Sequence, residues 1–332
     1  MKASPAFAAC LLLGLVSDAA LARRAEGDNR PNFIFVFPDT LRAESFNQYS
    51  PEAKKLNVTP YTESFFADGT SFDQAHVMHT QCSPSRCTMF TGRYMHILGH
   101  RTQSHLIQDY EYNYLRVLKE NGYHVQYYGK NDAFSATAFN LSVSYWEQKI
   151  GYASGSNAFQ HPTDPGYFSF LSTGSKTSGS DKSQADYEGA MEALSWLQNV
   201  NELPEPFVLF LPSRGAHPPY GAPVEWHDKF SPEDVKAAGI NLRPRNISNM
   251  PTYMSATEGI PFHRNIASLD DDFFYKIQAV YLGMVSYTDW IFGQLVEGVA
   301  KIENGALLNR TAVFFSSDHG DFGGDYGLVE KW

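Results

Sequence analysis

The stretch Asn32–Phe37 (NFIFVF) is a near-continuous apolar run, and Pro38-Asp39-Thr40 follows it directly. A strand that is buried on both faces of a parallel sheet has this pattern. Similar apolar runs occur at His124–Tyr128, Phe207–Leu211 and Ala312–Phe315. Asn32–Phe37 therefore predicts the first strand of a buried sheet, with Asp39 just beyond its carboxyl end.

Amphipathic segments lie between these runs. Apolar residues recur at helical spacing in two groups, which are Tyr187, Met191, Leu194 and Leu197, then Ile277, Tyr281, Met284, Ile291 and Leu295. The alternation predicts an α/β fold with a mostly parallel central sheet and helices on both faces. In such sheets the active site forms at the carboxyl ends of the strands.

Composition excludes several classes of protein. The 332 residues are 43% hydrophobic and 14% aromatic, which excludes disorder over most of the length. A net charge of −10 without a Lys/Arg run repels phosphate backbones, so we expect no nucleic-acid partner. Two loop-like stretches, Gly151–Asp186 and Asp228–Asp271, are long for connections, and we expect them to be surface excursions that shape a cleft.

The N-terminus has the features of a cleaved signal peptide. Lys2 precedes the apolar run Ala6–Val16, and Ala20-Leu21-Ala22 fits a signal-peptidase site, which predicts a signal peptide over residues 1–22. A membrane anchor is the alternative, but the run is shorter than the ~20 residues that span a bilayer. Asp18 also favours cleavage, so we expect no membrane anchor.

Four N-x-S/T triplets follow the signal peptide. They begin at Asn57, Asn140, Asn246 and Asn309. Each triplet alone is weak evidence, since some can be buried and never glycosylated. Together with the signal peptide they predict a glycoprotein of the secretory pathway, either extracellular or lysosomal.

The string Cys82-Ser83-Pro84-Ser85-Arg86-Cys87-Thr88-Met89-Phe90-Thr91-Gly92-Arg93 carries the clearest chemical signal. Pro84 suits an early helix position, and Ser83 or Ser85 suits a cap. Cys82 would then lie at a helix N-terminus, where the dipole favours an anionic group. On spacing alone, a plain Cys82–Cys87 disulfide or two buried thiols is as well supported as a reactive Cys82.

The whole string resembles the signature of the sulfatase family, C-x-P-S-R-x-x-x-x-T-G-R, at all seven fixed positions. The resemblance implies that Cys82 is converted to Cα-formylglycine by the formylglycine-generating enzyme during secretory transit. It also implies that the aldehyde hydrates and that one of its hydroxyls attacks sulfur. This role of Cys82 disfavours the disulfide.

The resemblance extends to a metal site. It implies that Asp39, Cys82, Asp318 and His319 bind one divalent cation, and carboxylate ligands favour Ca²⁺ over Mg²⁺ or Mn²⁺. Thr40 stands where many sulfatases have a second acid, which leaves its role open. Two nearby acids, Asp321 and Asp325, have no family role, and we expect them to be solvated or to cap helices.

The resemblance also implies a set of groups that face the sulfate ester. They are Arg86, Lys130, His217 and Lys331. The reference pKa of histidine, ~6.5, would let His217 also give a proton to the leaving oxygen. Many sulfatases have Trp-His after the lysine, but Asn131-Asp132 follows here. Either Asp132 takes a polar role, or His96 or His100 replaces the missing histidine.

The resemblance covers roughly residues 30–332 and implies the alkaline-phosphatase-like α/β fold. We expect residues 23–332 to be the N-terminal part of a sulfatase catalytic domain, truncated before the family's smaller C-terminal subdomain. The implied activity is hydrolysis of sulfate esters; aryl sulfates, sulfated polysaccharides and choline sulfate all remain open as substrates. A phosphodiesterase or phosphonate hydrolase of the same superfamily and a non-catalytic secreted fragment are the alternatives.

Overall fold

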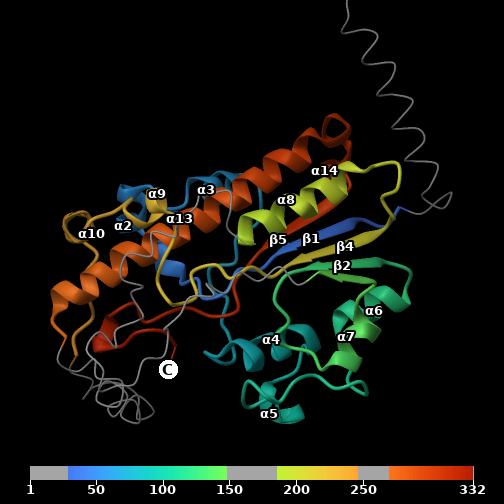
Figure 1. Ribbon diagram of the computed structural model, residues 1–332, viewed down its shortest axis with the longest axis horizontal. Coiled ribbons are helices and arrows are strands. Elements are labelled where there is room, and N and C mark those ends of the chain that lie inside the picture. The colour runs from blue at the N-terminus through green and yellow to red at the C-terminus, as the bar shows by residue number, and fades with distance from the viewer. Residues whose placement is uncertain (1–28, 148–184, 246–268, 332) are drawn as a thin grey trace, which may run out of the picture.

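The central sheet is parallel throughout. The computed structural model describes residues 29–147, 185–245 and 269–331 (Figure 1). In these residues five strands pair in the order β3-β2-β4-β1-β5. Their bounds are β1 (Asn32–Val36), β2 (His124–Tyr128), β3 (Tyr145–Glu147), β4 (Phe207–Leu211) and β5 (Thr311–Phe315).

Helices connect the strands and cover the sheet. The α-helices are α2 (Pro51–Leu56), α3 (Pro60–Ala67), α4 (Cys82–Thr91), α5 (Met95–Leu98), α6 (Tyr114–Glu120), α7 (Ala136–Ser142), α8 (Ala185–Gln198), α9 (Val224–His227), α10 (Pro232–Ala238), α13 (Asp271–Lys301) and α14 (Ala306–Asn309). Three short 3₁₀ helices complete the described structure; they are η1 (Ala43–Ser45), η3 (Ile302–Gly305) and η4 (Asp325–Gly327).

The two faces of the sheet bury alternate residues of each strand. On one face, Leu209 and its alternate neighbours pack against α8 and α13. On the other face, Phe210 packs against Phe90 of α4 and against α6 and α7. Figure 1 shows α8 and α13 on one side of the sheet and α4, α6 and α7 on the other. Because successive side chains of a strand point to opposite faces, apolar runs are needed to fill both cores.

Helix α13 is the longest element, with 31 residues. Its N-terminus is defined by Asp270, whose carboxylate accepts a hydrogen bond from the N–H of Phe273. Asp271 and Asp272 lie in the first turn and Lys301 in the last, which suits the helix dipole. Its N-terminal half packs with α10 and Tyr220 in a third core, which contacts the sheet at Phe315, the last residue of β5.

The predicted α/β architecture is confirmed, including the mostly parallel sheet with helices on both faces. The apolar runs are strands β1, β2, β4 and β5, and the two amphipathic patterns are α8 and α13. Strand β3 was missed because Tyr145 and Trp146 are exposed in a short edge strand without an apolar run. The excursion at Asp228–Asp271 contains helix α10 where it is described.

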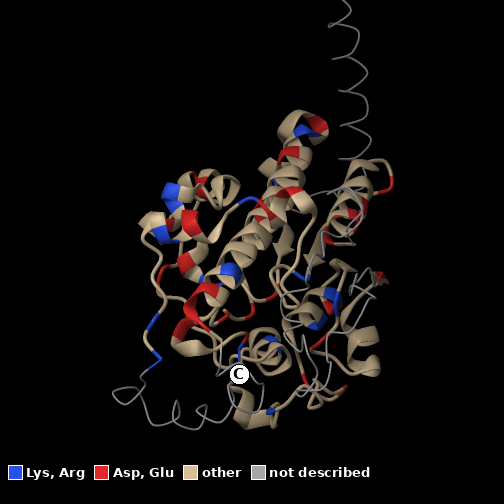
Figure 2. Cartoon of the chain, turned by 60° about the vertical axis from the view of Figure 1, so that its left-hand side comes forward, with Lys and Arg blue, Asp and Glu red and all other residues tan. Residues whose placement is uncertain are grey.

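Some predictions fall on residues outside the described ranges. They are the signal peptide over residues 1–22, residues 151–184 of the excursion Gly151–Asp186, residues 246–268 of the excursion Asp228–Asp271, and Asn246. In the described part, acidic and basic residues are interspersed along the outer helices (Figure 2). None of the described helices is both long enough and apolar enough to span a bilayer.

Candidate functional site

The site is built at the carboxyl end of β1. Asp39 follows this strand by three residues, is fully buried, and its backbone N–H bonds the carbonyl of Ser213 beyond β4. Thr40 has a positive φ of 65° and lies between two acids. Its hydroxyl donates to Asp39 Oδ1 at 2.6 Å and its N–H donates to Asp318 Oδ1 at 3.1 Å. Thr40 therefore holds two carboxylates together at the sheet edge.

Cys82 is the first residue of α4, as the dipole argument predicted. The capping prediction was wrong, because Gln81 is the N-cap and makes no side-chain cap. Ser83 bonds the side chain of Gln103, and the hydroxyl of Ser85 donates to the carbonyl of Asp318 at 2.5 Å. Both serines thus tie the helix start to other loops instead of capping it.

The two cysteines of the signature string are both free and buried. Cys87 lies on the core side of α4, with its Sγ 3.5 Å from the carbonyl of Ala133. Burial raises the pKa of the Cys87 thiol to about 12. The structure therefore has two buried thiols and no Cys82–Cys87 disulfide, and the two cysteines have different surroundings.

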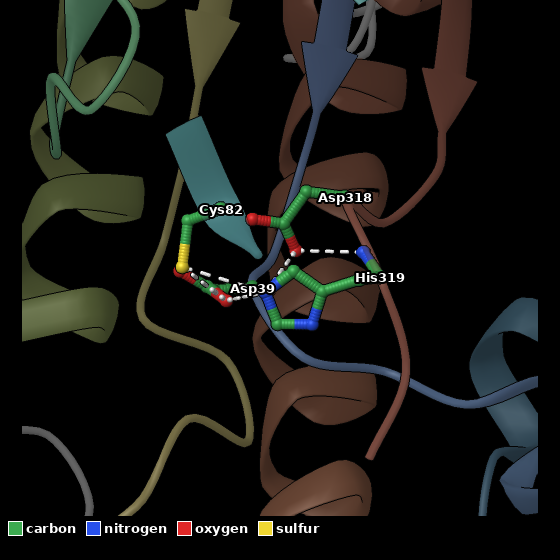
Figure 3. A group of neighbouring side chains, drawn as sticks. All are labelled: Asp39, Cys82, Asp318 and His319. Carbon is green, nitrogen blue, oxygen red and sulfur yellow. Dashed lines mark hydrogen bonds and ion pairs between the residues drawn. The ribbon is translucent and has the colours of Figure 1, made fainter. Parts of the chain in front are cut away.

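Four predicted ligands converge from three segments of the chain. The ligand atoms of Asp39, Cys82, Asp318 and His319 all lie within 4.8 Å of one another (Figure 3). His319 Nε2 is 3.2 Å from Asp39 Oδ1 and 3.4 Å from Cys82 Sγ. The other ring nitrogen of His319, Nδ1, lies 2.9 Å from the carbonyl of Gly320 and can donate to it. This contact turns Nε2 toward the cluster, as in many metal-binding histidines.

Cations surround the two acids of the cluster. Lys130 Nζ lies 2.6 Å from Asp39 Oδ2, Arg86 Nη2 lies 3.3 Å from the same oxygen, and Arg86 Nε lies 2.8 Å from Asp318 Oδ2. Burial alone would raise the pKa of Asp39, but Lys130, His319 and Arg86 outweigh it and hold that pKa well below its usual range. Both acids are thus paired with buried cations.

The negative charges of Asp39 and Asp318 raise the pKa values of His319 and Arg86. Burial lowers the pKa of His319, but Asp318 and Asp39 outweigh it and raise that pKa to about 10. They likewise raise the pKa of Arg86. The raised pKa favours a protonated His319 imidazole when no metal ion is bound, and a divalent ion would take the place of this proton.

Lys130 and Asp132 lie together on the loop after β2. Lys130 Nζ is 2.6 Å from Asp132 Oδ2 and 3.9 Å from Cys82 Sγ. Of the two alternatives, the polar role of Asp132 is the one that the contacts support. His96 stacks on Tyr94, and His100 is buried with its Nε2 3.3 Å from Glu111.

His217 and Lys331 meet over Cys82 from two loops. Lys331 Nζ is 2.7 Å from His217 Nε2 and 3.2 Å from Cys82 Sγ, while His217 Nδ1 is 2.6 Å from the carbonyl of Pro218. Burial and the charges of Lys331 and Lys130 lower the pKa of His217 to about 3, although Asp39 acts against this. This shift is away from the reference value of ~6.5 on which the expectation of a proton-donating His217 was based, and proton donation itself stays a prediction. In this arrangement the imidazole is neutral and Nε2 accepts a hydrogen bond from Lys331.

Two glycines let the loops approach one another. A Cβ on Gly129, just before Lys130, would lie 2.3 Å from the carbonyl oxygen of Pro212. A Cβ on Gly215 would lie 2.5 Å from the carbonyl oxygen of Asp39. Both residues also have positive φ angles, of 130° and 57°. No side chain fits at either position without moving a loop that carries a site residue.

Several polar residues near the site were not predicted from the sequence. Asp321 and Asp325 are buried, which contradicts the expectation of solvated or capping acids. Asp321 accepts from the hydroxyl of Tyr220, and Asp325 pairs with Arg42 at 2.9 Å. Asp186, at the start of α8, accepts the N–H groups of Arg214 and Gly215 at 2.9 and 3.0 Å. No local motif predicts that these acids are buried, since Tyr220, Arg42 and Arg214 are distant from them in sequence.

Comparisons with known proteins agree with this geometry. The chain is 23% identical to rat (Rattus norvegicus) arylsulfatase K over 315 residues, which are 90% of this chain and 52% of that protein. It is 24% identical to the uncharacterized sulfatase YidJ of Escherichia coli, over 91% of this chain and 59% of that one. The chain thus spans between half and three fifths of these relatives.

The fold has solved counterparts. The phosphonate monoester hydrolase of Agrobacterium radiobacter superposes with a TM-score of 0.70 at 17% identity, over 90% of this chain and 64% of that one. This likeness confirms the predicted alkaline-phosphatase-like fold. The model of the family described as Sulfatase matches residues 31–329, which include all the site residues described above except Lys331. The chain belongs to the sulfatase family.

Proposed function

We propose that the protein hydrolyses sulfate esters, with Cys82 as the precursor of its nucleophile. The observation that carries this proposal is the position of Cys82 Sγ. It lies at the first residue of α4, 3.2 Å from Lys331 Nζ, 3.4 Å from His319 Nε2 and 3.9 Å from Lys130 Nζ. Cationic and metal-ligating groups therefore converge on one side-chain atom, as a nucleophile that attacks an anionic ester requires.

The nucleophile of this proposal is formylglycine formed from Cys82. Sγ marks where the aldehyde carbon's oxygen atoms would lie. A hydrated aldehyde supplies a hydroxyl that can attack sulfur and a second hydroxyl that allows the sulfate to be released. Arg86 Nη1 is buried and has no hydrogen-bond partner within the described part of the chain, so it can still donate to a group that binds beside it.

The second component of the proposal is one divalent cation, with Ca²⁺ favoured. Asp39, Asp318, His319 and residue 82 would hold it, and the fit rests on their converging donor atoms and on the hydrogen bond that aims His319 Nε2 inward. Carboxylate oxygens suit a hard cation. When bound, the ion supplies positive charge that offsets the negative charge developing on the ester. Thr40 keeps both carboxylates in place through its hydroxyl and N–H.

The remaining groups act on the substrate in this proposal. Lys130, Lys331 and Arg86 bind the sulfate oxygens and exclude neutral esters. Lys331 Nζ donates a hydrogen bond to His217 Nε2 at 2.7 Å. An anionic ester beside His217 raises the pKa of that imidazole, so that it can pass a proton to the leaving oxygen. Asp132 holds Lys130 together with Asp39, since Nζ lies 2.6 Å from a carboxylate oxygen of each.

We propose further that residues 1–22 are a signal peptide and that residues 23–332 belong to the sulfatase catalytic domain. Formation of formylglycine needs the formylglycine-generating enzyme, and this places maturation in the secretory pathway, with an extracellular or lysosomal destination. Three of the four predicted glycosylation asparagines, Asn57, Asn140 and Asn309, lie in the described part and are exposed there. Exposure supports the assignment as a glycoprotein.

Mass spectrometry of the peptide that contains Cys82, combined with turnover of an aryl sulfate, tests the proposal. The secreted protein should carry formylglycine at residue 82 and should hydrolyse the ester in the presence of Ca²⁺. An unmodified thiol together with no turnover would leave a non-catalytic secreted fragment as the better description, which the partial coverage of the relatives keeps open.

A phosphonate or phosphodiester substrate is the second candidate. The observation that favours it is the fold likeness to a phosphonate monoester hydrolase. An aryl sulfate and an aryl phosphonate monoester both carry one negative charge, so the two candidates differ in the shape of the transferred group. Measurement of kcat/KM for matched aryl sulfate and aryl phosphonate esters decides between them, and we expect the sulfate to be the better substrate.

A further inference from the structure

Tyr220 connects the two loops that meet over Cys82. It follows His217 by three residues and is fully buried. Its hydroxyl lies 2.9 and 3.0 Å from the two carboxylate oxygens of Asp321, to which it donates. The same hydroxyl accepts the N–H of Glu330 at 3.1 Å. One oxygen atom thus joins the loop after β4 to both ends of the segment that follows His319.

That segment is a folded turn which ends at Lys331. Asp321 Oδ1 accepts the N–H of Gly323 at 2.6 Å, and the N–H of Phe322 bonds the carbonyl of Glu330 at 2.7 Å. Glu330 has a positive φ of 62°, so its backbone turns sharply just before Lys331. The direction in which Lys331 leaves the turn therefore depends on where the backbone of Glu330 is held.

Tyr220 connects the segments of His217 and Lys331, the two side chains that must be placed accurately over Cys82. Lys331 Nζ reaches both His217 Nε2 and Cys82 Sγ, at 2.7 and 3.2 Å. His217 and Lys331 come from segments that are more than a hundred residues apart in the sequence. The Tyr220 hydroxyl connects the two segments. Tyr220 belongs to the loop of His217, and its hydroxyl contacts Glu330, the residue before Lys331.

We propose that Tyr220 is a positioning residue that, through its hydroxyl, holds Lys331 against His217 and over residue 82. This inference rests on the proposed function, since it assigns these two side chains to the sulfate ester. Loss of the hydroxyl leaves the carboxylate of Asp321 and the N–H of Glu330 without this partner in a buried place. The turn then shifts, and a displacement of about 1 Å at a catalytic group can cost on the order of 10²-fold in rate.

A double-mutant cycle of Tyr220→Phe with Lys331→Ala tests the inference. Tyr220→Phe should lower kcat/KM for a sulfate ester on the order of 10²-fold in the wild-type background. In the Lys331→Ala background the same change should cost no more than about threefold, because there is no lysine left to misplace. Equal losses in both backgrounds would overturn the proposal and leave Tyr220 with a purely structural role.

Tyr281→Phe is the matched control. Tyr281 is also fully buried in the same core, and its ring meets that of Tyr220 edge to face with centroids 6.2 Å apart. Its hydroxyl bonds the carbonyl of Thr40 and the N–H of Arg42, and so holds the other side of the site. Whatever Tyr281→Phe costs, it should cost the same with and without Lys331. A coupling as large as that of Tyr220 would refute a specific role for Tyr220.

Two further measurements keep the test decisive. If Tyr220→Phe does not fold, Asp321→Asn alters the other end of the same hydrogen bond and should show the same coupling to Lys331→Ala; additive effects would overturn the proposal. Binding of inorganic sulfate, measured by calorimetry, gives a readout without turnover. Tyr220→Phe should weaken it on the order of tenfold only when Lys331 is present. A wild-type protein that cleaves no ester would refute the proposed function, while the sulfate-binding cycle would still decide on Tyr220.

Discussion

Asp39 and Asp289 are both almost completely buried, but their surroundings are opposite in kind. Asp39 is paired with Lys130, Arg86 and His319, and its pKa lies well below the usual range. Asp289, on α13, accepts backbone N–H groups at the start of α3, and burial raises its pKa to about 6 in spite of them. Burial of an acid is therefore not the signal of a functional site. The signal is an acid held ionised by cations that also face a nucleophile.

Replacement of Cys82 should have the largest effect, and this effect should be on activity and not on stability. Cys82→Ala should reduce turnover of an aryl sulfate on the order of 10⁵–10⁶-fold, as loss of a nucleophile does. The free energy of unfolding should change by about 1 kcal/mol or less, since the side chain is small. Kinetics and urea unfolding of the same preparation measure both. Cys82→Ser should stop after one turnover, because a serine lacks the second hydroxyl; sustained turnover would argue against formylglycine.

A matched pair of amide substitutions sharpens the comparison of the two acids. Asp318→Asn should lose the bound metal and at least 10²-fold in activity, because a carboxylate ligand and the partner of Arg86 disappear together. Asp289→Asn should keep both. Elemental analysis by mass spectrometry and kcat/KM are the measurements. Stoichiometric Ca²⁺ in the Asp318→Asn protein would place the metal elsewhere.

The sulfate-facing groups should differ according to the leaving group. His217→Ala should slow alkyl or sugar sulfates by on the order of 10²–10⁴-fold, and activated aryl sulfates far less, because a nitrophenolate leaves without a proton. Lys130→Ala should slow both classes to a similar degree, since a fixed charge acts on the sulfate in either ester. The measurement is kcat/KM on both classes for both variants. Similar losses for His217→Ala would mean that His217 binds sulfate but moves no proton.

Asp289 should affect stability as a function of pH. Its pKa is about 6 in the folded state, against about 4 when exposed, so the folded state holds the proton more tightly. This contribution to stability is fully present below about pH 4 and is lost as pH rises through about 6, by up to about 3 kcal/mol. The free energy of unfolding of wild type minus that of Asp289→Asn should therefore fall between pH 4 and pH 7. A difference that does not vary with pH would show that the carboxylate is ionised throughout.

The strands and the positions of several site residues could be predicted from the sequence, but the contacts between the loops of the site could not. The apolar runs located β1, β2, β4 and β5 because a strand buried on two faces must be apolar throughout. The positions of Asp39, Cys82 and Asp318 were predictable because carboxyl ends of parallel strands share one edge and the signature string supplies the cysteine. The contacts of Asp132, Tyr220 and Asp321 were not, since each depends on which loops meet, and a polar residue in a loop has no periodicity. The lowered pKa of His217 depends on its burial and on Lys331, a residue 114 positions away, and no local pattern reveals either.

Helix α13 should determine how cooperatively the protein unfolds. It is roughly 46 Å long at ~1.5 Å per residue. Its first half, around Phe274 and Tyr281, is packed in the core beneath Tyr220, and its second half, around Phe292 and Leu295, is packed against the sheet. One continuous helix thus belongs to these two cores, and neither core can unfold without breaking hydrogen bonds of α13. Amide protons at the middle of α13 should accordingly exchange only when the whole described structure unfolds, whereas those of the short helices α5 and α9 can exchange through local openings.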